Sequence, residues 1–368
     1  MPPIPQSPIK VAVLDDYQGI AARHFEHLKP SFDTTVFRDT LLPYNHPSTP
    51  ENVKQELVER LKPFTIISAM RERTPFPAAL LEKLPNLKLL LSTGGRNLSI
   101  DLEAAQKHGI RVTGAPGKGR TDSPGSIKTK RGPDSTTQHA IALILGIARN
   151  IASDDKIVKE GGWETELATG LSGKTFGTVG LGRLGVNVAK ILYSVFGMRV
   201  IAWSSSLTQE IADHKAREAG FPVETDGEKT FKVVGKEELF KEADVVSVHY
   251  VLSDRSRGIV GAKELSLMKK SALFINTSRG PLVDEASLLA VLKEGKIRGA
   301  AIDVFNLEPL PKDSQWRSSK WGTEGRSHVL LSPHMGYVEE ETMSNWYDEQ
   351  VEIIEKWHKG EPLLNVLA

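Results

Sequence analysis

Three side chains that could act together on a small carboxylic acid follow three apolar runs in the second half of the sequence. Arg279 comes after the run 273–275, Glu308 after the run 300–302, and His334 after the run 329–331. Arginine binds a carboxylate through two parallel hydrogen bonds, and histidine exchanges protons near neutral pH. Ligands of open α/β sheets bind outside the carboxyl ends of the strands, so we expect the three side chains to converge there.

Each of these residues also has an ordinary structural interpretation. Arg279 could cap a helix, and Glu308 could form a surface ion pair with Lys312. His334 could be a hydrogen-bonded histidine of the core. For any one residue alone the structural interpretation is favoured. Their shared position beside a glycine-rich turn favours a common site.

That glycine-rich turn is the first of the elements that would position them. Residues 175–179 alternate like a strand, and Gly180, Gly182 and Gly185 then open an amphipathic helix. Such glycines allow a tight turn, close approach of the backbone to a pyrophosphate, and close packing of helix on strand. Glycines also cluster in ordinary tight turns. Because a strand precedes the turn and a helix follows it, we predict a dinucleotide site.

Apolar strands alternate with helices along nearly the whole chain, which is typical of parallel sheets covered on both faces. The first half has predicted strands at residues 10–15, 34–37, 64–69, 87–92 and 110–113, and helices at 21–28, 52–61, 78–83 and 102–108. The second half has predicted strands at residues 175–179, 199–203, 245–249, 273–277, 300–304 and 329–331. A long helix at 135–151 joins the halves. We therefore predict an α/β protein with two doubly wound domains.

A basic segment at residues 117–133 interrupts this alternation. It has five Lys or Arg residues against the single acid Asp122, and Gly, Ser and Pro make up much of the rest. This composition cannot bury a core, so we expect a flexible insertion. A basic lid or partner-binding arm is the functional alternative, and a tolerated surface insertion is the favoured interpretation.

Composition favours a soluble protein that acts on small molecules. The chain has 368 residues, 39% hydrophobic content and a formal net charge of +1, which argues against general binding of nucleic acid or membranes. It has no cysteine, so disulfides, a thiolate nucleophile and cysteine-bound zinc are excluded. The longest apolar run, 140–148, is too short to span a membrane, and no secretory signal is visible. The cytosol is the expected location.

The segments 180–185, 276–280, 303–310 and 332–336, in this order, resemble those of the D-isomer-specific 2-hydroxyacid dehydrogenases, and the similarity extends over nearly the whole chain. The resemblance implies a dinucleotide-binding Rossmann domain, residues 134–336, inserted in a flavodoxin-like substrate domain formed by residues 1–116 and 337–368. It also implies an NAD(P)-dependent oxidoreductase, like the glyoxylate and hydroxypyruvate reductases, which reduces a small 2-oxo acid to the D-2-hydroxy acid without a metal.

The resemblance assigns roles to the three residues. Arg279 would bind the substrate carboxylate and contact the C2 carbonyl. His334 would donate a proton to the carbonyl oxygen as hydride reaches C2. Glu308 would orient the imidazole and favour its protonated form.

The resemblance also implies the binding residues. The cofactor would be bound by Gly180, Gly182, Arg183, Leu184, Gly185, Ser204, Ser205, Thr277 and Asp303, of which Asp303 would hold the nicotinamide carboxamide. The substrate would meet backbone N–H groups of the loop that contains Gly94, Gly95 and Arg96. Arg71 would line the same pocket, although a solvent-facing loop arginine is the favoured interpretation.

Two positions depart from the family pattern. The acidic residue expected about 20 positions after the glycines, which would bind the ribose 2′-OH of NAD, is replaced by serines at 204–206. A 2′-phosphate is then not repelled, so we favour NADP(H), with NAD(H) as the alternative. Gln138 stands where many relatives have glutamate before a histidine, and no mechanism follows from that change.

Two further points concern partners and an alternative function. A homodimer is expected from the resemblance, with residues 152–171, including Trp163, as the interface arm or else as an ordinary surface loop. The substrate can be glyoxylate, hydroxypyruvate or a bulkier 2-oxo acid.

Some relatives are corepressors that sense dinucleotide and bind peptides, and these can retain Arg279, Glu308 and His334. The lack of a long disordered extension argues against that function.

Overall fold

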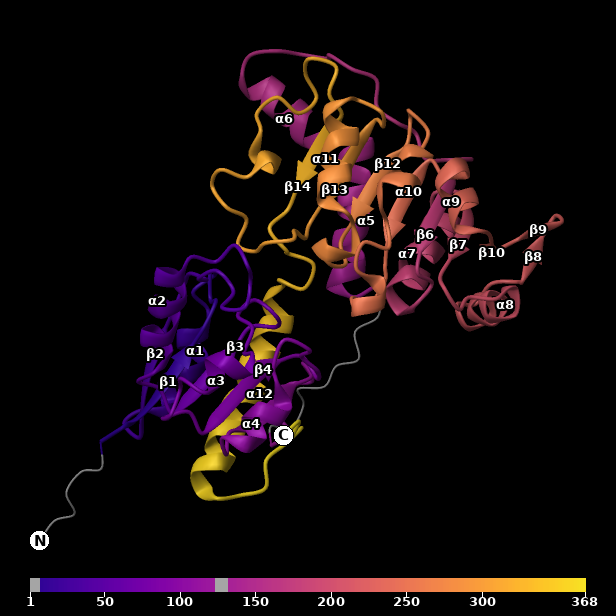
Figure 1. Ribbon diagram of the computed structural model, residues 1–368. Coiled ribbons are helices and arrows are strands. Elements are labelled where there is room, and N and C mark those ends of the chain that lie inside the picture. The colour runs from indigo at the N-terminus through magenta and orange to yellow at the C-terminus, as the bar shows by residue number, and fades with distance from the viewer. Residues whose placement is uncertain (1–6, 123–131) are drawn as a thin grey trace, which may run out of the picture. The chain divides into compact units, whose positions relative to one another are not determined.

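The computed structural model describes residues 7–122 and 132–368 (Figure 1). The chain divides into two compact units. Unit 1 contains Met1–Arg131 and Val338–Ala368, and unit 2 contains Gly132–Tyr337. The second unit is therefore inserted in the first, as the predicted architecture requires.

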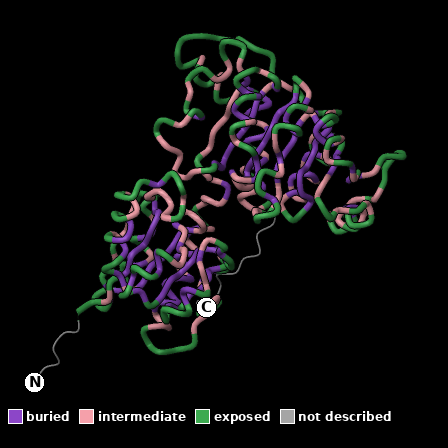
Figure 2. The backbone as a smooth tube through the Cα atoms, in the orientation of Figure 1, coloured by how far each residue is buried: buried purple, intermediate pink, exposed green. Residues whose placement is uncertain are grey.

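Unit 1 is built on one parallel sheet with the strand order β2-β1-β3-β4-β5. Its strands are β1 (Ile9–Val13), β2 (Phe32–Val36), β3 (Ile66–Ala69), β4 (Leu89–Thr93) and β5 (Arg111–Ala115). Its helices are α1 (Ala21–Phe25), α2 (Glu51–Leu61), α3 (Ala78–Leu81), α4 (Leu102–Lys107) and α12 (Glu340–Lys359), with a 3₁₀ turn at Glu26–Leu28. Every residue of β3 and β4 is buried, because helices cover both faces (Figure 2). The flavodoxin-like prediction is confirmed.

The C-terminal segment belongs to this unit through α12, which packs on α1, β4 and β5. Beyond the helix the chain returns to the sheet edge, where Val366 bridges Thr113 in antiparallel fashion. Glu339 caps the start of α12 by accepting the N–H of Thr342 at 3.1 Å. These contacts explain why residues far apart in sequence form one domain.

The start of the basic segment is attached to α12. Three carboxylates on the helix accept hydrogen bonds from residues 117–121, namely Glu349, Glu352 and Glu355. The N–H of Gly117 donates to Glu349 at 2.8 Å, and Arg120 donates to Glu355 at 2.6 Å. Burial raises the pKa of Glu349, although the backbone N–H groups oppose this shift. The composition did not predict that residues 117–121 are hydrogen-bonded to α12. Residues 123–131 of the segment lie outside the described residues.

Unit 2 is built on a seven-stranded parallel sheet with the order β10-β7-β6-β11-β12-β13-β14. Its strands are β6 (Thr175–Val179), β7 (Arg199–Trp203), β10 (Lys232–Val233), β11 (Val245–Val248), β12 (Leu273–Asn276), β13 (Gly299–Ile302) and β14 (His328–Leu331). Its helices are α5 (Ser135–Ala148), α6 (Ile151–Lys159), α7 (Arg183–Ser194), α8 (Gln209–Glu218), α9 (Lys236–Glu242), α10 (Ala262–Ser266) and α11 (Glu285–Lys293). An apolar cluster lies on each face of the sheet. One cluster packs the sheet against α9, α10 and α11, and the other packs it against α5, α7 and α8. This is the predicted Rossmann arrangement.

Two details of unit 2 differ from the predictions. The sheet has a seventh strand, the two-residue β10 at its edge, and a small hairpin precedes it, formed by β8 (Glu224–Thr225) and β9 (Glu228–Lys229). The long helix predicted at 135–151 ends at Ala148. Asn150 adopts a left-handed conformation with φ 56°, which asparagine tolerates, and α6 then begins in a new direction.

The glycine-rich turn depends on contacts that exclude any side chain. A Cβ on Gly185 would lie 2.2 Å from the carbonyl oxygen of Gly180, so helix α7 packs directly on the turn. Gly180 has φ +101°, and a Cβ there would meet the carbonyl of His249 at 2.5 Å. Gly182, the N-cap of α7, has no atom within 4 Å of its Cβ position. The N-terminus of α7 is therefore left open to a ligand.

We predict that Gly185→Ala destabilises the protein by about 1–3 kcal/mol, because the added methyl must displace backbone. Gly182→Ala is the matched control, since its Cβ enters open space at a φ of −78°. Thermal unfolding of both variants measures the difference. Equal melting temperatures would contradict the packing argument.

Candidate active site

The central feature of the site is a hydrogen-bonded pair of side chains, His334 and Glu308, that joins the loops after β13 and β14. His334 Nδ1 lies 2.6 Å from Glu308 Oε2, with side-chain exposures of 15% and 28%. The other carboxylate oxygen of Glu308 accepts the N–H of Phe305 at 2.8 Å. Glu308 is thus fixed by its own loop and holds one ring nitrogen of His334. The second ring nitrogen is then available for proton exchange with a ligand.

Asp303 fixes the turn that carries His334. Its main-chain oxygen accepts the N–H of His334 at 2.7 Å, and its buried carboxylate accepts those of Met335 and Gly336 at 2.9 and 3.3 Å. His139 of α5 also binds this carboxylate at 3.0 Å. Although burial opposes ionisation of Asp303, these hydrogen bonds keep its pKa below the ordinary value. Asp303 therefore positions the histidine turn, a role that the sequence did not predict.

Arg279 follows β12, the neighbour of β13 in the sheet. The side chain of Asn276 shapes its turn by donating to the carbonyl of Arg279 at 3.0 Å and accepting the N–H of Ser278 at 3.0 Å. A 3₁₀ turn, Gly280–Leu282, comes next. A Cβ on Gly280 would lie 2.1 Å from the carbonyl carbon of Phe305, so the Arg279 turn packs on the loop that contains Glu308.

These contacts bring the three predicted residues to the same edge of the sheet. β12, β13 and β14 are adjacent and parallel, and Arg279, Glu308 and His334 follow their carboxyl ends. The geometry joins His334 directly to Glu308 and joins Arg279 to them through its backbone. An arginine fork and a histidine–glutamate pair at one edge can bind a carboxylate and move a proton.

The predicted cofactor residues lie along the same edge of unit 2. The turn Gly180 to Gly185 follows β6, the partly buried Ser204 and exposed Ser205 follow β7, and the buried Thr277 and Asp303 follow β12 and β13. Leu184 is in the first turn of α7. Arg183 pairs with Asp134, and Asp134 also caps α5 by accepting the N–H of Thr137 at 2.9 Å. The arginine thus ties α7 to α5.

In unit 1, the predicted substrate residues are brought together by a close contact. Arg71 follows β3 and packs on the loop after β4, where a Cβ on Gly94 would lie 1.9 Å from Arg71 Nη1. The guanidinium carbon also lies 6.0 Å from the ring centre of Trp346. Only 26% of the arginine side chain is exposed, so it is not the solvent-facing loop residue that the sequence favoured. Gly95 and Arg96 are exposed beside it.

Two buried acids at the end of β1 escaped the sequence reasoning. Asp16 accepts the N–H groups of Ile20 and Ala21 at 3.2 and 3.0 Å, at the start of α1. Asp15 accepts from Thr74 at 3.1 Å and from Thr40, and its burial raises its pKa to about 6. The partners of Asp15 lie in other loops, so no local pattern indicates its burial, whereas those of Asp16 are only four and five residues further along the chain.

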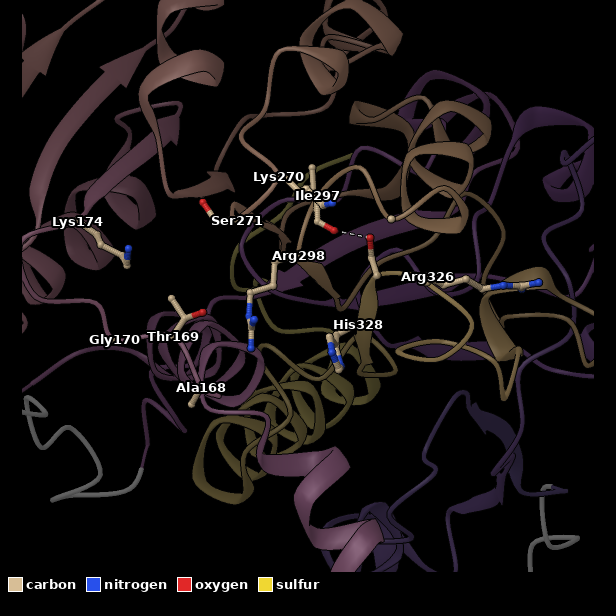
Figure 3. Close-up of a pocket in the computed structure, with 13 residues that line it drawn as sticks. Ala168, Thr169, Gly170, Lys174, Lys270, Ser271, Ile297, Arg298, Arg326 and His328 are labelled. Carbon is tan, nitrogen blue, oxygen red and sulfur yellow. Dashed lines mark hydrogen bonds between the residues drawn. The ribbon is translucent and has the colours of Figure 1, made fainter. Parts of the chain in front are cut away.

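A basic groove of about 700 Å³ lies at the opposite edge of the unit 2 sheet (Figure 3). Its basic lining residues precede or begin strands, and they are Lys174, Lys270, Arg298, Arg326 and His328. Helix α11 ends at this groove, where Gly295 lines it. Positive side chains at a helix C-terminus complement its dipole. The groove therefore has a structural explanation and does not include the His334–Glu308 pair.

Neither a metal cluster nor a membrane span is found in the described ranges 7–122 and 132–368. No group of three His, Asp or Glu side chains there is arranged to hold a metal ion. No helix in the same ranges is long and apolar enough to cross a bilayer.

Comparison with known proteins identifies the family. The model described as D-isomer specific 2-hydroxyacid dehydrogenase, NAD binding domain, matches residues 141–336. The model of the catalytic domain of the same family matches residues 11–123. The chain belongs to the D-isomer-specific 2-hydroxyacid dehydrogenase family. The match to an NAD binding domain indicates a nicotinamide dinucleotide as its cofactor.

Individual relatives carry several names. The chain is 34% identical over 316 residues to D-3-phosphoglycerate dehydrogenase of Methanocaldococcus jannaschii. The aligned residues make up 85% of this chain and 53% of that protein, so this chain spans about half the length of that relative. It is 34% identical over 291 residues to glyoxylate reductase of Thermococcus litoralis, covering 77% of each. A crystal structure of phosphoglycerate oxidoreductase from Vibrio cholerae O395 is similar with a TM-score of 0.77 and 33% identity, covering 96% of this chain and 99% of the other.

We predict that His334→Gln lowers kcat for 2-oxo acid reduction by roughly 10²-fold or more, because glutamine cannot transfer the proton. Cofactor affinity should stay unchanged, since the glycine turn is untouched. His214→Gln on α8, where the histidine side chain is 66% exposed, serves as the control. Steady-state rates and cofactor fluorescence titration measure both quantities. A His334→Gln variant with wild-type kcat would remove His334 from the role of acid.

Proposed function

We propose that this protein reduces a small 2-oxo acid to the D-2-hydroxy acid with NAD(P)H. The observation that carries the proposal is the 2.6 Å pair of His334 and Glu308, formed at the sheet edge where the Arg279 turn packs on the Glu308 loop. Membership of the D-isomer-specific 2-hydroxyacid dehydrogenase family supports the same reaction.

Each of the three residues has a separate task in this proposal. Arg279 binds the substrate carboxylate, because its planar fork matches two carboxylate oxygens. His334 donates the proton from its free ring nitrogen to the carbonyl oxygen. Glu308 accepts the N–H of Nδ1, so the proton that passes to the substrate is carried by Nε2 of the doubly protonated ring. The bound reduced nicotinamide supplies the hydride.

We assign substrate contacts in unit 1 to the Arg71 and Gly94 pair. The side chain of Arg71 packs on the backbone of Gly94, which fixes the guanidinium beside the loop that continues to Gly95 and Arg96. Exposed backbone N–H groups in such a loop suit a carboxylate. Arg71→Met is expected to raise KM for the 2-oxo acid more than it lowers kcat.

The proposed cofactor is NADP(H) in preference to NAD(H). Ser204 and Ser205 occupy the position where an acidic residue would accept the ribose 2′-OH. Thr277 lies buried after β12, at the same edge as Asp303, and we assign both to the nicotinamide half. The carboxylate of Asp303 serves first as acceptor for the His334 turn, so its contact with a carboxamide would share that acceptor capacity.

The direct test is oxidation of NADPH and, in parallel, of NADH with glyoxylate, hydroxypyruvate, pyruvate and a branched 2-oxo acid. Turnover to a product of D configuration, shown by chiral chromatography, is the expected result. Tight cofactor binding without turnover of any of these acids would instead favour a dinucleotide-sensing protein of the corepressor kind. Production of the L isomer would contradict the proposed D-2-hydroxy acid product.

We also propose a homodimer formed through the arm at residues 152–171. Three large apolar side chains are exposed there, Val158 at 53%, Trp163 at 74% and Leu167 at 89%. The arm is nevertheless fixed to its own unit, because Arg298 donates to the carbonyl of Leu167 at 2.6 Å and His328 pairs with Glu166 at 2.8 Å. A rigid segment with exposed apolar side chains suits an interface.

Light scattering after gel filtration tests the dimer. The wild type should have about twice the chain mass of 40.4 kDa. The double variant Trp163→Ser, Leu167→Ser should shift toward the monomer, because it removes the apolar contact area. Val195→Ser, at another side chain that is 70% exposed, is the control. A monomeric wild type would refute the dimer, and an unshifted double variant would refute the arm as its interface.

A further inference from the structure

The serine turn after β7 is bound to a tyrosine from the loop after β11. Tyr250 Oη accepts the N–H of Ser205 at 3.2 Å and lies 2.8 Å from Ser205 Oγ. The tyrosine ring stacks on Trp203, the last residue of β7, with centroids 6.2 Å apart and planes inclined by 20°. The phenol therefore spans the distance between the two loops.

This bridge crosses the carboxyl end of β6, because β6 lies between β7 and β11 in the sheet. A Cβ on Gly180 would lie 3.3 Å from Tyr250 Cδ2, so the ring passes over the first glycine of the turn. The carbonyl of Tyr250 accepts the hydroxyl of Ser278 at 2.7 Å, which fixes its main chain. In a dinucleotide fold, the next strand after the glycine turn ends beside the adenosine ribose. In this chain that strand is β7. Tyr250 Oη thus lies at the position that reads the 2′ substituent.

The polar groups at this position can act as hydrogen-bond donors. The serine hydroxyls and the phenol each carry one donor, and the N–H of Ser205 is already bonded to the phenol oxygen. A lysine is also near, because Lys236 Nζ lies 5.3 Å from the ring centre of Trp203, while Glu264 pairs with it at 2.9 Å. No carboxylate stands in the serine turn at 204–206. Donors suit phosphate oxygens, which are acceptors only.

We propose that Tyr250 is a specificity-determining residue whose hydroxyl donates to the 2′-phosphate of NADP(H), with Ser205 holding the phenol oxygen in place. The phenol oxygen can accept from both the N–H and the hydroxyl of Ser205, and in that arrangement the phenol proton points to a phosphate oxygen. This inference rests on the proposed cofactor role of unit 2 and adds the residue that reads the phosphate.

Binding of two adenosine fragments tests this proposal without turnover. The probes are 2′,5′-ADP and 5′-AMP, which differ by the 2′-phosphate, and the measurement is calorimetric titration of the full chain. Tyr250→Phe keeps the ring that stacks on Trp203 and removes only the hydroxyl. We expect it to weaken 2′,5′-ADP about tenfold, as for loss of a hydrogen bond to a charged group, and 5′-AMP less than about twofold. Tyr193→Phe on α7, a tyrosine that packs edge-on against Phe221, is the matched control.

Each other result overturns the proposal. Equal weakening of both fragments would make Tyr250 a packing residue for adenosine, and unchanged affinities would leave it outside the site. Tighter binding of 2′,5′-ADP would mean that the phenol occupies the place of the phosphate. A wild type that binds the two fragments equally would remove the selectivity itself. Turnover of 2-oxo acids with NADH tests the proposed reaction separately, because it needs no 2′-phosphate.

Discussion

The hydrogen bonds that converge on Asp303 determine where His334 can act. His334 has φ 54°, a left-handed conformation that costs a non-glycine residue on the order of 1–3 kcal/mol. The turn is held there because the carbonyl and carboxylate of Asp303 accept three successive N–H groups, from His334 to Gly336. The buried carboxylate would lose two of its hydrogen-bond donors if the turn relaxed, and this cost opposes release of the strain. The orientation of the imidazole toward Glu308 follows from this backbone arrangement.

Backbone packing also joins the remaining part of the site. Gly280 lets the Arg279 turn lie directly on Phe305, three residues before Glu308, where any side chain would separate the two loops.

The two edges of the unit 2 sheet differ in electrostatic character. The glycine turn at the carboxyl edge presents the N-terminus of α7, whereas the groove at the other edge receives the C-terminus of α11 and is lined by cations. An anionic cofactor is favoured at the first edge by the helix dipole itself.

The sequence predicted the elements well, because apolar periodicity follows directly from burial. The strands 175–179 and 199–203 were predicted to the residue, and the Rossmann and flavodoxin-like sheets were both expected. It did not reveal β10, since two residues at a sheet edge carry no periodic signal. It also missed the partners of acids: His139 meets Asp303 across 164 positions, and Glu349 meets Gly117 across 232. Such pairs are set by strand order, which local patterns do not encode.

The serine turn at 204–206 shows what the absence of an acidic residue implies for cofactor selectivity. From the sequence, the absence of an acid at 204–206 meant only that a 2′-phosphate is not repelled. The structure adds Tyr250, which lies 45 positions away from Ser205 in the chain. Hydroxyl groups also accept hydrogen bonds, so they can serve a ribose 2′-OH as well as a phosphate. The nearby cation, Lys236, is already paired with Glu264. Selectivity at this turn therefore depends on hydrogen bonding more than on net charge, and should be moderate, with NADH still able to bind.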